Sequence, residues 1–195
     1  MRAGALVLAL AVVLIGGGCT VAVSGDPVAA GESPSSLRPL PFTPTINDRT
    51  NDRTDGTTFE PCNAYTDAEL IALNINPETI TDAAQVDSAN YRGCRWRAQN
   101  YTAARGGGQY SQIVGREMTL DQYKRYLSTK VWQTDRMASG RPIAVAAENN
   151  GCSASFSSEQ SIVTTIATST NPSPGNVLEC DRAVAFASLA ISKAP

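Results

Sequence analysis

The sequence predicts an α+β fold: a single domain with an antiparallel sheet of about five strands and about three helices packed on one side of it. Two observations carry this prediction. Strand-like patterns follow one another in runs, with helical patterns before, between and after them, rather than strictly alternating with helices. In addition, four cysteines of the region 59–195 are enough for two disulfides. We therefore expect the globular domain to span residues 59–195.

The first elements of this region are a capped helix and a strand. "YTDAELIALNI" (65–75) carries Thr66 and Glu69 at the spacing of a capping box, before an apolar face. Asn76-Pro77 is expected to end this helix. "GCRWRAQ" (93–99) alternates between two faces, which predicts a half-buried strand. "QYSQIVGRE" (109–117) is expected to be its hairpin partner.

The second half of the domain repeats these signals. "TLDQYKRYLSTKV" (119–131) predicts a second helix, which Thr119 caps. "RPIAVAAENNGCSASFS" (141–157) carries Asn150-Gly151 between two strand-like runs, a strong hairpin signal. "SIVTTIATS" (161–169) is β-branched and predicts the next strand. "ECDRAVAFASLAISKA" (179–194) predicts a helix that is apolar almost all round, as expected of one packed against a sheet.

The N-terminal residues are typical of an export leader. Residues 1–18 contain an apolar run of signal-peptide length, too short to span a bilayer, and end in three glycines. Cys19 follows, and a small-residue run that ends in cysteine resembles the lipobox of bacterial lipoproteins, in which that cysteine is lipidated. We therefore interpret 1–18 as a lipoprotein signal peptide and Cys19 as the anchor for acyl groups such as palmitate. Cleavage after Ser24, which would give a secreted protein, is the alternative.

Residues 19–58 are predicted to be the lipidated cysteine and a disordered tether. They are rich in proline and serine and contain the tandem repeat NDRT (47–50 and 51–54). Such a segment buries too little apolar surface to offset the entropy lost on ordering. Lipidation would place the domain on the outer face of the cell membrane. The formal net charge of −2 argues against a nucleic-acid-binding protein.

The four remaining cysteines are expected to form structural disulfides. An even number in an exported chain is typical of a disulfide framework. Three pairings are open, and we favour Cys62–Cys94 with Cys152–Cys180, because these close loops of similar size. The chain has no histidine and no C-x-x-C pair, so we expect neither a metal site nor a cofactor.

Two stretches resemble a known family. "FEPCNAYTDAELIALNI", followed by "YRGCRWRA", is similar to the start of the domain of unknown function 3558 in lipoproteins of actinobacteria, including mycobacteria. The resemblance covers roughly residues 59–195. It implies an exported lipoprotein of the cell envelope. It implies no activity and no catalytic residue, because the biochemistry of the family is not established.

Charge segregation supplies the candidate binding residues. From Ser88 to Arg116 there is no acidic residue. Arginine suits phosphate and carboxylate groups, so we take Arg92, Arg95 and Arg97 as candidate anion-binding residues. The alternative is that these arginines lie on a solvated sheet face with no ligand, where acidic residues from elsewhere in the fold balance their charge.

The expected function is that of a membrane-tethered, non-catalytic module which binds an anionic lipid, a glycan or a protein partner of the envelope. The alternative is a carrier of a lipid or another apolar ligand, which would need an apolar cavity. An enzyme is the third hypothesis. It is disfavoured because a chain without histidine cannot use Ser-His-Asp or Cys-His catalysis.

Overall fold

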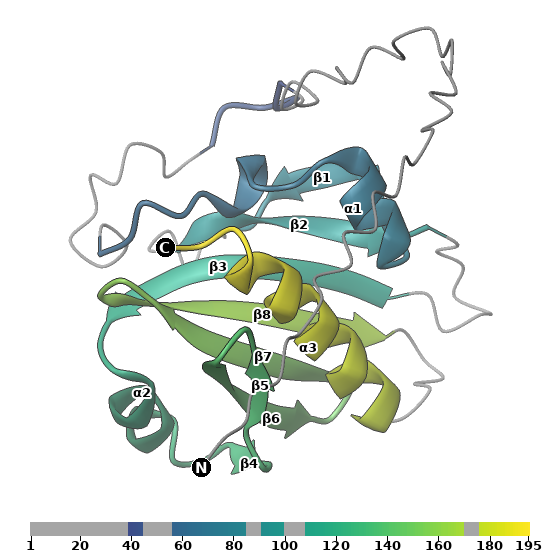
Figure 1. Ribbon diagram of the computed structural model, residues 1–195. Helices are drawn as coiled ribbons and strands as arrows, with labels where there is room; N and C mark the ends of the chain where they lie inside the picture. Colours follow the sequence, from purple (N-terminus) through teal and green to yellow (C-terminus); the bar gives the residue numbers. More distant parts are fainter. Residues whose placement is uncertain (1–38, 45–55, 85–90, 100–107, 170–175) are drawn as a thin grey trace, which may run out of the picture. The chain divides into compact units, whose positions relative to one another are not determined.

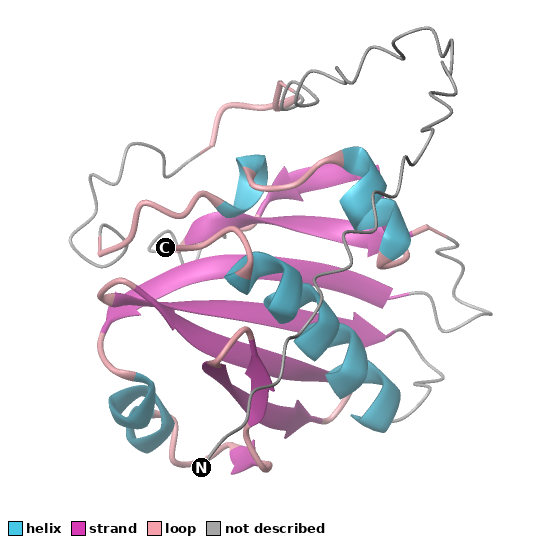
Figure 2. Cartoon of the chain, viewed as in Figure 1, coloured by secondary structure: helices cyan, strands magenta, loops and turns pink. Residues whose placement is uncertain are grey.

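The computed structural model describes residues 39–44, 56–84, 91–99, 108–169 and 176–195 of the 195-residue chain. It confirms the α+β prediction, with one antiparallel sheet, helices packed on it and two disulfides (Figures 1 and 2). Cys19 and the NDRT repeat lie outside the described residues, so their predicted roles stay predictions. Of the described helices, none has the length and apolar character needed to cross a bilayer.

The sheet has eight strands where about five were expected. Its order is β1-β2-β3-β8-β7-β6-β4, and β5 also pairs with β6. All five predicted strands are present, and the unpredicted ones are β1, β4 and β5. Strand β1 contains Pro77, which is typical of the end of an element rather than of a strand. Strands β4 and β5 have only two and three residues. The strands are β1 (Ile75–Asp82), β2 (Arg92–Ala98), β3 (Gly108–Glu117), β4 (Val131–Trp132), β5 (Arg136–Ala138), β6 (Arg141–Glu148), β7 (Gly151–Ser158) and β8 (Ser161–Ser169).

The β6–β7 hairpin forms as predicted, but its turn is one residue earlier than expected. Asn149 and Asn150 make the turn, and Gly151 is the first residue of β7. Gly151 lies close to the neighbouring strand, because a Cβ atom there would be 2.7 Å from the carbonyl oxygen of Ala167. Close backbone approach, rather than the turn, therefore requires glycine at this position.

The first two α-helices begin at the predicted caps, whereas the third begins at Asn176, three residues before its predicted start. Thr66 with Glu69, and Thr119 with Gln122, each form a complete capping box. The first helix is shorter than predicted, because Asn74 adopts φ 61° and turns the chain directly into β1. The described helices are the 3₁₀ turn η1 (Pro61–Asn63), α1 (Asp67–Ala72), α2 (Leu120–Tyr126) and α3 (Asn176–Ile191).

The core lies between α3 and one face of the sheet. Figure 1 shows α3 crossing this face diagonally. Phe186 is fully buried, and its ring centroid lies 5.2 Å from that of Tyr65, 5.5 Å from Trp96 and 6.2 Å from Tyr110. Edge-on and tilted contacts of this kind are favourable for aromatic rings. The space between helix and sheet is therefore filled by large side chains.

Helix α2 covers the opposite face of the sheet. Val163 and Ala167 of β8 belong to the core under α3, so Thr164 between them points to the other face. The hydroxyl groups of Tyr123 on α2 and Thr164 are hydrogen-bonded at 3.1 Å. The expectation that all helices pack on one side is therefore wrong for α2. An amphipathic pattern predicts that a helix packs on a sheet, but it does not say on which face.

Candidate functional site

The sheet is interrupted in β1, opposite the predicted arginine strand. Asn76 pairs with Arg97, and Thr81 pairs with Arg95, so residues 77–80 bulge out opposite Trp96 alone. The side chain of Thr79 replaces the missing strand contact, since its hydroxyl accepts a hydrogen bond from the backbone N–H of Arg97 at 2.8 Å. A proline at 77 cannot donate a ladder hydrogen bond, which explains why this edge strand bulges there.

The bulge creates an open groove beside Arg95 and Arg97, on the face of β2 that points away from the core. We call it the arginine groove. Its volume is about 390 Å³. Arg95 is half-buried in it and forms no ion pair with any described residue, and Arg97 is exposed beside it. Gln109 of β3 pairs with Arg97 across the strands. The lining residues are Glu78, Thr79, Ile80, Thr81, Arg95, Trp96, Arg97 and Gln109.

Arg92 does not lie in this groove. Side chains alternate along a strand, so Arg92 shares the core face with Cys94 and Trp96, opposite to Arg95. Its side chain is 1% exposed. Nη1 donates to the carbonyl oxygen of Phe59 at 2.7 Å, and Nη2 donates to that of Thr57 at 2.8 Å. Arg92 also pairs with Glu60. Arg92 therefore holds residues 57–60 against the domain. Of the three predicted arginines, only Arg95 and Arg97 line the groove.

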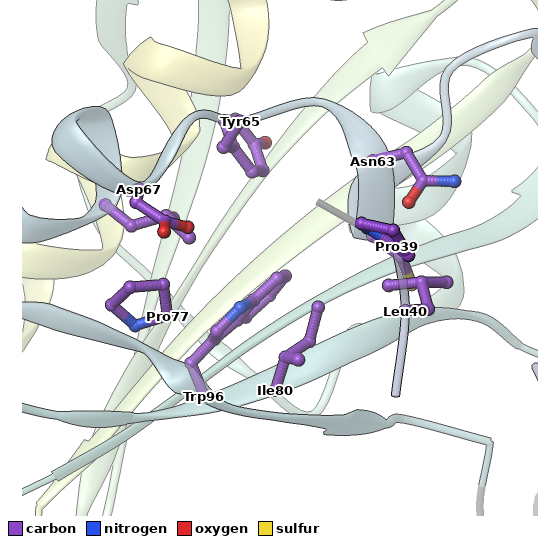
Figure 3. A pocket seen from close by; sticks show the side chains of 10 residues that line it. Pro39, Leu40, Asn63, Tyr65, Asp67, Pro77, Ile80 and Trp96 are labelled. Atoms are coloured by element: carbon purple, nitrogen blue, oxygen red, sulfur yellow. The ribbon is translucent and has the colours of Figure 1, made fainter. Parts of the chain in front are cut away.

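A small recess lies on the core side of the same bulge (Figure 3). It holds about 20 Å³. Figure 3 shows Trp96 and Ile80 together on one side, with Asp67 and Pro77 near one end and Pro39 and Leu40 near the other. The indole nitrogen of Trp96 is buried and has no acceptor among the described residues. The sequence placed Trp96 in a half-buried strand, but it gave no sign that α1 and residues 39–40 would surround it.

A third pocket lies between α2 and the sheet. It holds about 80 Å³ and is lined mainly by apolar and aromatic side chains, including Ile113, Met118, Tyr126 and Leu127. Arg116 lies over the ring of Tyr126, 5.0 Å from its centroid. Sites for small-molecule ligands usually hold roughly 300–1,000 Å³. The Trp96 recess and this pocket both fall below that range, so neither has room for a lipid chain.

Two buried tyrosines have raised pKa values, and both contribute to the core rather than to a reactive site. Burial raises the pKa of Tyr65 well above its ordinary value, although its hydrogen bond to Gln112 opposes this. Burial also raises the pKa of Tyr110. Both phenols therefore stay neutral inside the core. Among the described residues there is no cluster of three or more histidine, cysteine or carboxylate side chains that could hold a metal ion.

Both disulfides form in the predicted pairing. Cys62–Cys94 joins η1 to β2, and Cys152–Cys180 joins β7 to α3. Disulfides persist mainly in oxidising compartments, so these two bonds indicate an extracytoplasmic domain.

The class of protein is thus a disulfide-bonded, extracytoplasmic α+β domain. A comparison with protein families identifies it further. The chain matches the model described as "Protein of unknown function (DUF3558)" over residues 14–193, and it belongs to that family. This confirms the family that the sequence resembled. Neither a curated protein nor a solved structure matches the chain.

Proposed function

We propose that this protein is a lipoprotein of the cell envelope whose non-catalytic domain binds an anionic envelope component through the arginine groove. Cys19 carries the lipid and holds the domain at the outer face of the cell membrane. The tether between them gives the groove access to lipid headgroups and to glycans near the membrane. In this proposal the ligand is recognised by its phosphate or carboxylate groups.

The observation that carries the proposal is the placement of Arg95 and Arg97 on one open face of β2. Two guanidinium groups two residues apart on a strand point the same way and can contact one anionic group together. Gln109 and Thr79 add polar side chains beside them. Glu78 also lines the groove and limits how much negative charge a ligand can bring close to it.

The same geometry weighs against the other hypotheses. A carrier needs an apolar cavity, and the pocket beneath α2 holds about 80 Å³. An enzyme needs a nucleophile beside a base or converging acid groups in a cleft. The arginine groove brings together two cations, an amide and one carboxylate, which suits binding better than bond cleavage.

Anion binding is tested with vesicles and the Arg95→Ala/Arg97→Ala variant. The exported chain is made with Cys19→Ser so that its lipid cannot anchor it, and it is mixed with phosphatidylglycerol or phosphatidylcholine vesicles. Each arginine near an anionic surface contributes about 1 kcal/mol, so we expect binding to phosphatidylglycerol to weaken about 30-fold. A phosphorylated monosaccharide as a soluble competitor distinguishes a glycan from a lipid headgroup.

The matched control is Arg125→Ala/Arg136→Ala, which removes the same charge from two exposed positions on α2 and β5. This control should retain most of the binding. Equal binding by both double variants would mean that the groove is not the site.

The lipid anchor is tested separately. Metabolic labelling with a fatty acid should label the wild-type chain, and Cys19→Ala should abolish the label. A label that persists in Cys19→Ala, or a wild-type chain released unlabelled into the medium, would refute the anchor.

A further inference from the structure

The pocket between α2 and the sheet has the features of a separate binding site, and we call it the α2 pocket. Its lining is mainly apolar and aromatic, and among the described residues that line it only Arg116 is charged. The lining residues are Tyr91, Ile113, Gly115, Arg116, Met118, Tyr123, Tyr126, Leu127 and Thr164.

The pocket exists because long side chains hold α2 away from the sheet. Strand β3 is irregular around Gly115, where its pairing with β8 shifts register, and glycine has no side chain to fill the space above it. Tyr123 spans the gap, since its hydroxyl group meets that of Thr164 at 3.1 Å. Helix α2 itself has no buried residue. A hollow of about 80 Å³ therefore remains between the helix and the sheet.

Arg116 brings an unbalanced positive charge to this pocket. It is half-buried, and it forms no ion pair with any described residue. Its guanidinium lies over the ring of Tyr126, 5.0 Å from the centroid. This cation–π contact offsets part of the cost of removing the charge from water, but it uses none of the five N–H donors of a guanidinium. The pocket therefore presents positive charge and hydrogen-bond donors next to apolar walls.

We propose that the α2 pocket binds a small monocarboxylic acid with a short branched apolar tail, such as isovalerate. The carboxylate accepts hydrogen bonds from Arg116, and the tail lies against Met118, Leu127 and the tyrosine rings. A planar guanidinium matches a carboxylate in geometry. It also balances one negative charge, whereas a phosphate monoester carries about two. The cation therefore favours a carboxylate, and the apolar walls favour one with a tail.

The volume of the pocket sets the size of the tail. An apolar cavity of about 150 Å³ accepts benzene, with its six carbon atoms. The α2 pocket holds about 80 Å³, so it has room for a group of about three carbon atoms. The isopropyl end of isovalerate has this size, and its carboxylate then lies at the mouth of the pocket.

This site goes beyond the anion-binding role, because it uses Arg116 and neither Arg95 nor Arg97. The two ligands also differ in chemistry. The arginine groove is proposed to select for negative charge, and the α2 pocket for negative charge together with an apolar tail. A negative result at one site therefore does not refute the other.

The experiment follows methionine methyl groups by NMR on the exported chain with Cys19→Ser. Met118 lines the pocket and reports binding. Met137 on β5 is 65% exposed and serves as an internal reference, and Met137→Leu assigns the two signals. The probe is isovalerate. Acetate has the charge without the tail, isoamyl alcohol has the tail without the charge, and adamantane-carboxylate has a tail too large for the pocket.

Two variants test the cation and the walls separately. Arg116→Gln removes the charge, and Arg125→Gln on the exposed surface of α2 is its matched control. Gly115→Ala adds a methyl group to the pocket. Its Cβ atom would lie 3.4 Å from the carbonyl oxygen of Ile162 and 3.9 Å from the ring of Tyr91. These are ordinary contacts, so this variant should fold.

We expect isovalerate to shift the Met118 signal saturably, with a dissociation constant of about 1 mM, and to leave the Met137 signal in place. Each buried CH₂ group strengthens binding about fourfold, so acetate should bind more than about tenfold more weakly. Adamantane-carboxylate should not bind. Isoamyl alcohol should bind about tenfold more weakly than isovalerate, and Arg116→Gln should weaken isovalerate binding by the same factor, the usual effect of a charge-assisted hydrogen bond. Gly115→Ala should weaken binding about fourfold, and Arg125→Gln should leave it unchanged.

The proposal is overturned by a Met118 signal that does not shift at about 20 mM isovalerate. It is also overturned if acetate, isoamyl alcohol or adamantane-carboxylate binds as tightly as isovalerate, or if Arg116→Gln and Arg125→Gln weaken binding equally. The ligand comparisons use the wild-type pocket, so they decide the question even if a variant fails to fold.

Discussion

Replacing Arg92 with methionine should destabilise the domain, whereas the same change at Arg95 should not. Arg92 is buried, and its guanidinium donates to the carbonyl oxygens of Phe59 and Thr57 at 2.7 and 2.8 Å. Methionine keeps much of the apolar stem but cannot donate. Both carbonyl oxygens would lose their donor inside the protein, and residues 57–60 would lose their attachment to β2.

The size of the effect follows from these contacts. A hydrogen bond from a charged donor contributes about 1.5–3 kcal/mol. The ion pair with Glu60 adds little, because the Glu60 side chain is 42% exposed. Removing the guanidinium also removes the cost of burying a charge, so the lower end of the range applies. Two such bonds give a loss of about 3 kcal/mol in the free energy of unfolding. With a urea m-value of about 1.5 kcal/mol/M, the midpoint falls by about 2 M.

The assay is urea unfolding followed by tryptophan fluorescence. Arg95→Met is the matched control, since it removes the same charge from the same strand but from the opposite face, and it should stay within about 0.5 kcal/mol of wild type. If the two variants unfold within about 1 kcal/mol of each other, Arg92 does not hold residues 57–60 and the reasoning fails.

Two further predictions concern the core and the pH dependence of stability. Phe186→Ala should lower the free energy of unfolding by about 3–5 kcal/mol, because it empties the centre of the aromatic cluster. Val177→Ala on the same helix is 79% exposed and should change it by less than about 0.5 kcal/mol; similar losses would contradict a filled core. The hydrogen-bonded ion pair with Lys193 and the backbone N–H of Thr66 lower the pKa of Glu69. Glu69 therefore binds fewer protons when folded, and its contribution to stability is present above the unfolded pKa and lost as pH falls through the folded pKa. Glu69→Gln should flatten the acid limb of a stability profile between pH 3 and 6, and an unchanged limb would exclude this role.

Local sequence signals predicted most of the fold but only part of the site. Thr66 and Thr119 are caps that act through neighbouring residues, so both helix starts could be found without the structure. The five predicted strands were also found from local signals, such as the alternation in 93–99, the Asn150-Gly151 turn and the β-branched run 161–169. Strand β1 was missed, because Pro77 in its sequence normally ends an element, and only pairing with β2 makes an edge strand of it. The bulge that opens both the arginine groove and the Trp96 recess depends on this pairing, so Pro77 alone does not predict it.

The sequence by itself determined the class of fold and indicated the family, because capping, periodicity and short motifs are properties of short stretches of chain. It favoured one disulfide pairing of three, and the tertiary structure decided in favour of that one. The tertiary structure decided which face each helix covers and which arginines act together. Alternation along β2 separates Arg92 from Arg95, but only packing shows that Arg92 is the buried one, held by the backbone of residues 57–59. The same holds for Trp96, whose surroundings come from α1, β1 and residues 39–40, segments that only the folded chain brings together.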